Sequence, residues 1–145
     1  MPDPDLSRLV PHQGRMCLLD RVTAWSEGAI GCAARSHLDP ANPLRHAGRL
    51  AALCGVEYGM QAAAAHGTLL RQSAGDTGPG RPGYLAAIRG VELHVARLDD
   101  PAFGTLAVEA SLLLQERAGW IYGFELTAAD GTALVSGRGT IVMPP

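Results

Sequence analysis

The sequence predicts an α+β domain in which one buried helix is wrapped by a strongly curved antiparallel sheet. Three observations support this fold class. Residues 50–65 are small or apolar at all but three positions, which is typical of a helix that is buried on all sides. Residues 84–143 read as long strands, and residues 16–36 read as two short strands around a turn signal.

The 145 residues are enough for one domain, which we place at residues 1–145 and which would bury roughly two-thirds of its surface. A formal net charge of −2 and the lack of a basic run argue against binding to nucleic acid or to an anionic membrane. Residues 1–15 carry prolines and acids where a secretory signal needs a basic start and an apolar run. No segment has the length and apolarity of a membrane span.

The three cysteines, Cys17, Cys32 and Cys54, are widely separated and follow no metal-ligand spacing. We therefore expect reduced thiols that pack as small hydrophobic side chains, no zinc site, and a location in the cytoplasm.

The first half of the chain reads as a hairpin followed by an irregular loop. Residues 16–25 are apolar with β-branched and aromatic members, residues 26–28 form a turn signal, and residues 29–36 read as a second short strand. Residues 37–48 contain two prolines, an Asp and an Asn, so we expect irregular structure before the helix.

The second half reads as strands after one irregular connection. Glycines and prolines in residues 71–83 exclude regular structure, and we favour a solvated connection over a mobile flap. Gly90 suggests a bulge, and Asp130-Gly131 is a strong hairpin signal. The expected meander has four strands: 84–95, 105–115, 120–127 and 132–143.

One helix cannot cover both faces of such a sheet. A second copy that pairs edge to edge would hide the remainder, so we expect at least a dimer.

Three segments resemble one enzyme family. PHQGRMCLLDRV (residues 11–22) is similar to the PHxxPxLLVDRV opening of FabZ-type 3-hydroxyacyl-[acyl-carrier-protein] dehydratases. GVEYGMQAAA (residues 55–64) resembles their central helix, whose pattern is roughly ExMAQ. YLAAIRGVELHVARLDDP (residues 84–101) resembles the strand that lines their acyl tunnel. The more particular likeness is to divergent dehydratases of aryl-polyene and related pathways, which share the short PHxxxMxLLDR opening.

This resemblance implies the hotdog fold, in which a central helix is wrapped by a sheet. It also implies a dimer or a trimer of dimers, with an acyl carrier protein as the partner that presents the substrate. The implied reaction belongs to fatty acid or polyene-type biosynthesis and needs no cofactor.

The sequence departs from the family where the catalytic histidine is expected. Members carry that histidine in a GHFPGxPxxPG loop before the helix, whereas this chain has SHLDPANPLRHAG. His37 and His46 lie in that loop, and at most one of them is expected to act. His12 belongs to the shared PH motif, which in the family lies near the tunnel mouth, although a solvated loop histidine is equally compatible.

Dehydration of a 3-hydroxyacyl thioester requires removal of an α-proton and protonation of the departing hydroxyl. A carboxyl group in apolar surroundings holds its proton more tightly, so Glu57 in the apolar helix is the first candidate for a general acid. Alternatively, Glu57 lies on a side of the helix that faces a solvated dimer interface, where it pairs with an arginine. Gln61 lies one turn later on the same face and either orients the carboxylate or is satisfied by backbone.

Three residues of the first long strand, Leu85, Ala87 and Ile88, are candidates for lining an acyl tunnel, although core packing is their default role. We therefore expect a 3-hydroxyacyl-[acyl-carrier-protein] dehydratase that gives the trans-2-enoyl thioester. Two alternatives stay open: a hotdog thioesterase, in which the same carboxylate activates water, and a catalytically inactive hotdog subunit. The partner subunit is either a second copy or another hotdog chain.

Overall fold

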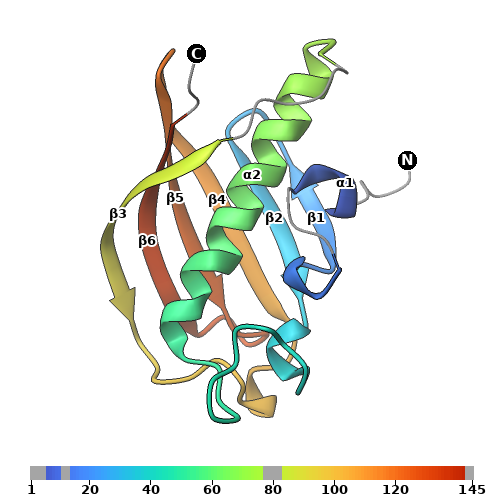
Figure 1. Cartoon of the computed structure of the whole chain (residues 1–145), viewed down its shortest axis with the longest axis vertical. Helices are drawn as coiled ribbons and strands as arrows, with labels where there is room; N and C mark the ends of the chain where they lie inside the picture. The colour runs from blue at the N-terminus through green and yellow to red at the C-terminus, as the bar shows by residue number, and fades with distance from the viewer. Residues whose placement is uncertain (1–5, 11–13, 77–82, 143–145) are drawn as a thin grey trace.

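A computed structural model describes residues 6–10, 14–76 and 83–142, and the fold is clear from it. A six-stranded antiparallel sheet curves around one long helix, α2 (Gly55–Ser73), which crosses its concave face (Figure 1). This is the predicted α+β architecture and the arrangement of the hotdog fold.

Short helical pieces and a hairpin precede α2. The chain begins with α1 (Leu6–Leu9), η1 (Gly14–Met16), β1 (Arg21–Trp25), β2 (Ala29–Ala34), η2 (Ser36–Leu38) and η3 (Ala52–Cys54). After α2 come β3 (Tyr84–Leu93), η4 (Pro101–Phe103), β4 (Leu106–Gln115), β5 (Gly119–Thr127) and β6 (Ala133–Val142).

The strands form where the sequence alternates. In β4, Leu106, Val108 and Ala110 are buried against the helix, whereas Ala107 and Glu109 between them are exposed. Alternate residues of a strand point to opposite faces, so this pattern places one face of the sheet on the core and the other in solvent.

The strand order, β1-β2-β4-β5-β6-β3, differs from the predicted meander. Of the four strands of the predicted meander, β4, β5 and β6 are neighbours in chain order. The fourth, β3, lies beyond β6, and β2 takes the place beside β4. Residues 94–105 between β3 and β4 make this possible because they cross below the start of α2, where Leu98 N donates to Leu50 O. Alternation predicts which residues form strands, but it contains no information on which strands pair.

The helix lies further along the chain than predicted. The predicted segment began at residue 50, but Ala51 forms a β-bridge with Arg97, and Ala52–Cys54 form a 3₁₀ turn, so α2 starts at Gly55. It continues to Ser73, which makes the first residues of the predicted irregular connection helical. Residues 77–82 of that connection lie outside the described residues.

Smaller corrections concern the first strand. Only Arg21–Trp25 of the predicted strand 16–25 is a strand, because Leu18 N donates to the Gln61 side chain instead of to a strand. The predicted hairpin turn and the predicted bulge are confirmed. Gly131 has a φ of 91° in the β5–β6 hairpin, and the β3–β6 register shifts between Arg89 and Glu92, around Gly90.

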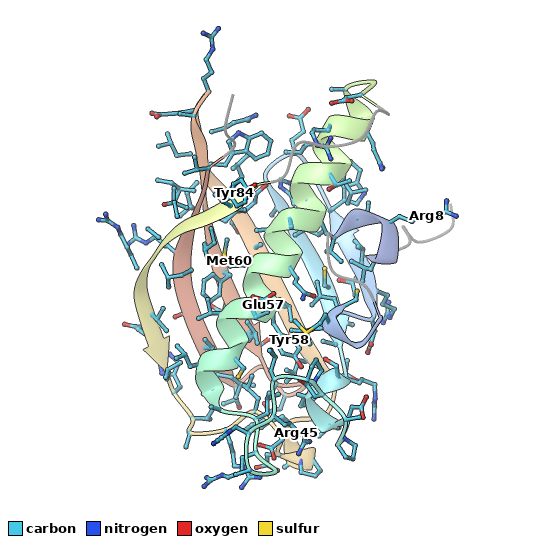
Figure 2. The ribbon with its side chains drawn as sticks, in the orientation of Figure 1. Arg8, Arg45, Glu57, Tyr58, Met60 and Tyr84 are labelled. Atoms are coloured by element: carbon cyan, nitrogen blue, oxygen red, sulfur yellow. The ribbon has the colours of Figure 1, made fainter. Side chains whose placement is uncertain are left out.

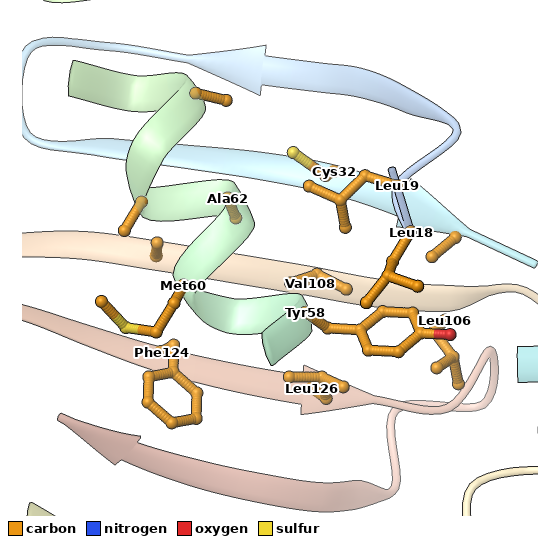
Figure 3. Packing of buried hydrophobic residues seen from close by; sticks show 14 of the residues in the cluster. Leu18, Leu19, Cys32, Tyr58, Met60, Ala62, Leu106, Val108, Phe124 and Leu126 are labelled. Atoms are coloured by element: carbon orange, nitrogen blue, oxygen red, sulfur yellow. The ribbon is translucent and has the colours of Figure 1, made fainter. Parts of the chain in front are cut away.

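Glycines allow α2 to approach the sheet closely. A Cβ on Gly59 would lie 2.7 Å from Cβ of Phe124 in β5, and one on Gly55 would lie 3.0 Å from Val135 in β6. Figure 3 shows Phe124 packed beneath this part of the helix, beside Met60. The core is therefore built between α2 and the middle strands, with the N-terminal turn of α2 closing one end.

Candidate functional site

Glu57 lies on the side of α2 that faces away from the sheet. Gly59 points at Phe124, and two residues span about 200° around a helix, so the side chain of Glu57 is directed almost opposite. Glu57 is partly buried, whereas the expectation placed it inside the core. It belongs to the first turn of α2, and Figure 2 shows its side chain on the front of the helix.

Gln61 connects Glu57 to the N-terminal segment. Its Nε2 donates to Met16 O at 2.6 Å and reaches Glu57 Oε1 at 3.4 Å, while its Oε1 accepts from Leu18 N at 2.9 Å. The Gln61 side chain is almost fully buried, and both ends of its amide are hydrogen-bonded. Backbone groups therefore satisfy the Gln61 amide, as one of the two alternatives has it, and the amide also contacts the Glu57 carboxylate.

Tyr58, next to Glu57, anchors this turn of the helix to the preceding loop. Ser36 Oγ donates its single proton to Leu18 O at 2.6 Å, so the Tyr58 hydroxyl donates to Ser36 Oγ at 2.7 Å. Asn42 Nδ2 donates to the same Tyr58 oxygen at 3.1 Å. Burial raises the pKa of Tyr58, which keeps the hydroxyl protonated and able to donate.

Two arginines and an aspartate close the loop before α2. Asp99 accepts from Arg97 Nη2 at 2.5 Å, from Arg45 Nη1 at 3.4 Å and from Leu50 N at 3.2 Å. The hydrogen bonds from the Arg97 guanidinium hold the pKa of the Asp99 carboxyl well below its usual range. Arg45 also donates to His37 O, so this cluster joins the loop to the link between β3 and β4 (Figure 2).

His37, one of the three predicted histidines, is enclosed beneath this loop. Its side chain has no exposed surface, and neither ring nitrogen has a hydrogen-bond partner among the described residues. Burial lowers its pKa below the ordinary value of 6.5, and the charges that act on it belong to Arg35, Asp20 and Arg45. In this chain by itself, His37 is therefore sealed from a substrate in solvent.

The other histidines occupy different surroundings. His46 is exposed in a tight turn, where its backbone pairs with that of Arg49. His12 lies outside the described residues. His94 is exposed just after β3, near Glu92.

His66 is buried inside α2, seven residues before the end of the helix. Its Nε2 lies 2.7 Å from Ser26 O and its Nδ1 lies 2.7 Å from the Tyr122 hydroxyl. A carbonyl only accepts, so Nε2 carries the proton and Tyr122 donates to Nδ1. The hydrogen bonds of Tyr58 were not predicted from the sequence either. Their only signal there is a loop that contains Ser and Asn and precedes a buried tyrosine.

The predicted acyl-binding residues lie in β3, one of the two edge strands of the sheet formed by the described residues. Leu85 is exposed, while Ala87 and Ile88 are partly buried, with Ile88 packed on the core. β3 curves away from α2, whose main contacts are with β4 and β5 (Figure 1).

Within residues 6–10, 14–76 and 83–142, no group of three or more His, Cys, Asp or Glu side chains has metal-binding geometry. Cys17, Cys32 and Cys54 are unlinked, and burial raises the pKa of Cys32 to about 12. Among the helices described, none combines the length and the hydropathy that crossing a bilayer requires.

Comparison with known proteins identifies one family. The model of the ApeP-like family, described as ApeP dehydratase, matches residues 4–145. A chain in the structure of the dehydratase heterocomplex ApeI:P from Xenorhabdus doucetiae has a TM-score of 0.82 and 23% identity, with 97% of this chain and 91% of that chain covered.

Other structures share the fold at lower identity. A hypothetical thioesterase with coenzyme A from Streptococcus pneumoniae has a TM-score of 0.59 and 14% identity, with 85% of this chain and 84% of that chain covered. A thioesterase from Staphylococcus aureus has a TM-score of 0.60 and 10% identity, with coverages of 86% and 92%. No curated protein sequence matches this chain significantly.

Proposed function

The chain belongs to the ApeP-like dehydratase family, and on this premise we propose that it dehydrates a 3-hydroxyacyl chain held as a thioester on an acyl carrier protein. The product is the trans-2-enoyl thioester, in biosynthesis of the fatty acid or aryl-polyene type. The observation that carries the proposal is Glu57, a carboxylate on the front of the central helix that touches the buried Gln61 amide.

In the proposed reaction, the α-carbon loses a proton and the β-carbon loses its hydroxyl group, so that a C=C bond forms and water leaves. Glu57 in its acid form protonates the departing hydroxyl, and a histidine removes the α-proton. The thioester oxygen gains negative charge during this step, and the positive end of the α2 dipole, beside Glu57, is suited to stabilise it.

We favour His12 over His37 and His46 as the base within this chain. The Gln61 amide fixes Met16 beside the turn that carries Glu57, and His12 precedes Met16 by only four residues. His37 is sealed, and His46 belongs to an exposed turn beyond the Arg45–Asp99 cluster.

For binding, we propose that the acyl chain lies along Leu85, Ala87 and Ile88, and that a second hotdog subunit covers this side. The subunit is another copy of this chain or a related hotdog chain, as in the ApeI:P heterocomplex. Free thiols agree with a reaction in the reducing cytoplasm.

The test is enoyl formation from a 3-hydroxyacyl chain loaded on an acyl carrier protein, with the purified chain alone and with a hotdog partner. Glu57→Gln removes the proton donor and preserves the shape, so we expect the rate to fall at least about 100-fold. Glu125→Gln, on the exposed face of β5, is the matched control and is expected to keep the wild-type rate. Unchanged activity in Glu57→Gln would remove Glu57 from the mechanism.

Two alternatives give different readouts in the same assay. The thioesterases of the same fold suggest hydrolysis, which releases free thiol without enoyl product. The sealed ring of His37 suggests an inactive subunit, for which activity would require the partner and would be indifferent to Glu57→Gln.

A further inference from the structure

His37 is buried at a cost that its surroundings offset only in small part. Its ring has no exposed surface, and both nitrogens lack hydrogen-bond partners in the described part of the chain. Buried polar groups in folded proteins are normally hydrogen-bonded, and an exception calls for an explanation. Leucine or methionine would fill a similar volume here without this cost.

The surroundings of His37 disfavour its charged form. Burial is the largest cause of its lowered pKa, and the guanidinium groups of Arg35 and Arg45 act in the same direction. Asp20 and the backbone of Gly104 oppose the shift, but Asp20 already accepts from Arg35 N at 2.8 Å. The ring is therefore neutral inside the closed loop at pH 7, and protonating it there is unfavourable.

The turn that carries His37 also joins three parts of the molecule. Ser36 connects the N-terminal segment at Leu18 O to the Tyr58 hydroxyl of α2, and Ser36 O accepts from Asn42 Nδ2. His37 O accepts from Arg45 Nη2 at 3.1 Å. If η2 moves outward, all of these hydrogen bonds break together, and the helical turn that carries Tyr58 and Glu57 loses its anchor.

We propose that residues 36–49 form an acid-operated latch, in which protonation of His37 expels η2 from the core and frees the first turn of α2. Once expelled, the imidazole is in water and titrates near 6.5. Above this pH the closed state is fully favoured. Below it, each further pH unit shifts the ratio of open to closed molecules up to tenfold toward the open state, until the pH reaches the pKa of the closed form. The latch would operate whether or not the chain catalyses the proposed reaction.

Amide hydrogen exchange tests the latch without any substrate. Leu38, Asp39, Asn42 and Arg45 all donate their backbone N–H groups within the loop, so their protection factors report its closure. In the wild type we expect these protection factors to fall up to tenfold per pH unit between pH 6.5 and 5, while those of β4 and β5 stay constant. In His37→Leu the fall is expected to disappear.

His46→Gln is the matched control, because it removes an exposed histidine of the same loop and is expected to retain the wild-type pH dependence. Equal pH dependence in the wild type and His37→Leu would overturn the proposal. Should His37→Leu fail to fold, NMR titration of the wild-type ring decides: a pKa below 6.5 that coincides with loss of loop protection supports the latch. A pKa at or above 6.5 overturns it.

Discussion

Gln61 shows how one side chain connects remote parts of this chain. It joins the α2 turn that carries Glu57 to backbone groups of residues 16 and 18, more than 40 positions earlier. Without it, a buried N–H and a carbonyl would lose their partners, and the N-terminal segment would lose its attachment beside the carboxylate. Its role is thus structural and positional together.

Replacing Gln61 by leucine keeps the volume but removes both hydrogen-bonding ends. The N–H of the buried Leu18 and the carbonyl of Met16 would be left unsatisfied at about 1–3 kcal/mol each. We expect the free energy of unfolding, measured in urea, to fall by about 2–6 kcal/mol. Gln72→Leu, at an exposed position near the end of α2, is the control and should change it by less than about 0.5 kcal/mol. An equal effect of both substitutions would show that Gln61 is not a link.

At the scale of the element, α2 depends on glycines where it meets the sheet. Gly59 faces Phe124 so closely that a Cβ would overlap the root of that side chain, which cannot move without its strand. Gly67 faces Trp120, but there a Cβ would lie 3.6 Å away, an ordinary contact distance. The same residue type therefore has a packing role at one position and only a conformational cost at the other.

Alanine substitutions separate these two roles. In Gly67→Ala, the gain in helix propensity should raise the free energy of unfolding by about 0.5–1 kcal/mol. In Gly59→Ala, overpacking against Phe124 exceeds that gain and should lower it by about 1–3 kcal/mol. Chemical unfolding of the two variants beside the wild type measures both values, and a change of the same sign in both would contradict this account.

At the scale of the molecule, the two edges of the sheet differ in how much apolar surface they expose. Among the described residues neither β1 nor β3 has a strand on its outer side, but it is in β3 that three large apolar side chains, Tyr84, Leu85 and Leu93, are about half exposed. Glu57 on the front of α2 is also only partly covered. An exposed apolar edge strand favours pairing with another chain, so we propose that a hotdog partner binds here.

Charge on this edge should weaken the association. We expect the double variant Leu85→Lys, Leu93→Lys to lower the affinity for the partner subunit at least tenfold in sedimentation equilibrium, because two lysines would have to be buried in the interface. Leu113→Lys is the control: Leu113 is equally exposed but lies in β4, away from the free edge. Loss of association in Leu113→Lys alone would place the interface elsewhere.

The sequence by itself determined the fold class, the strand segments and the turns, because periodicity, small apolar runs and Gly-containing turns are local signals. It also identified Glu57 and Gln61 as neighbours, since a spacing of four residues places them on one helical face. The resemblance in three segments led to the family that the comparison confirmed.

Only the tertiary structure decided which strands pair, where the helix begins and where the histidines lie. β3 reaches the far edge of the sheet because a link crosses beneath α2, and α2 starts late because Leu50 and Ala51 pair with that link. His37 is enclosed because Asn42 and Arg45 fold back onto the carbonyl groups of residues 36 and 37, while Asp99 of the β3–β4 link holds Arg45 in place. Such contacts depend on how the chain packs in three dimensions, and no local pattern of residues specifies them.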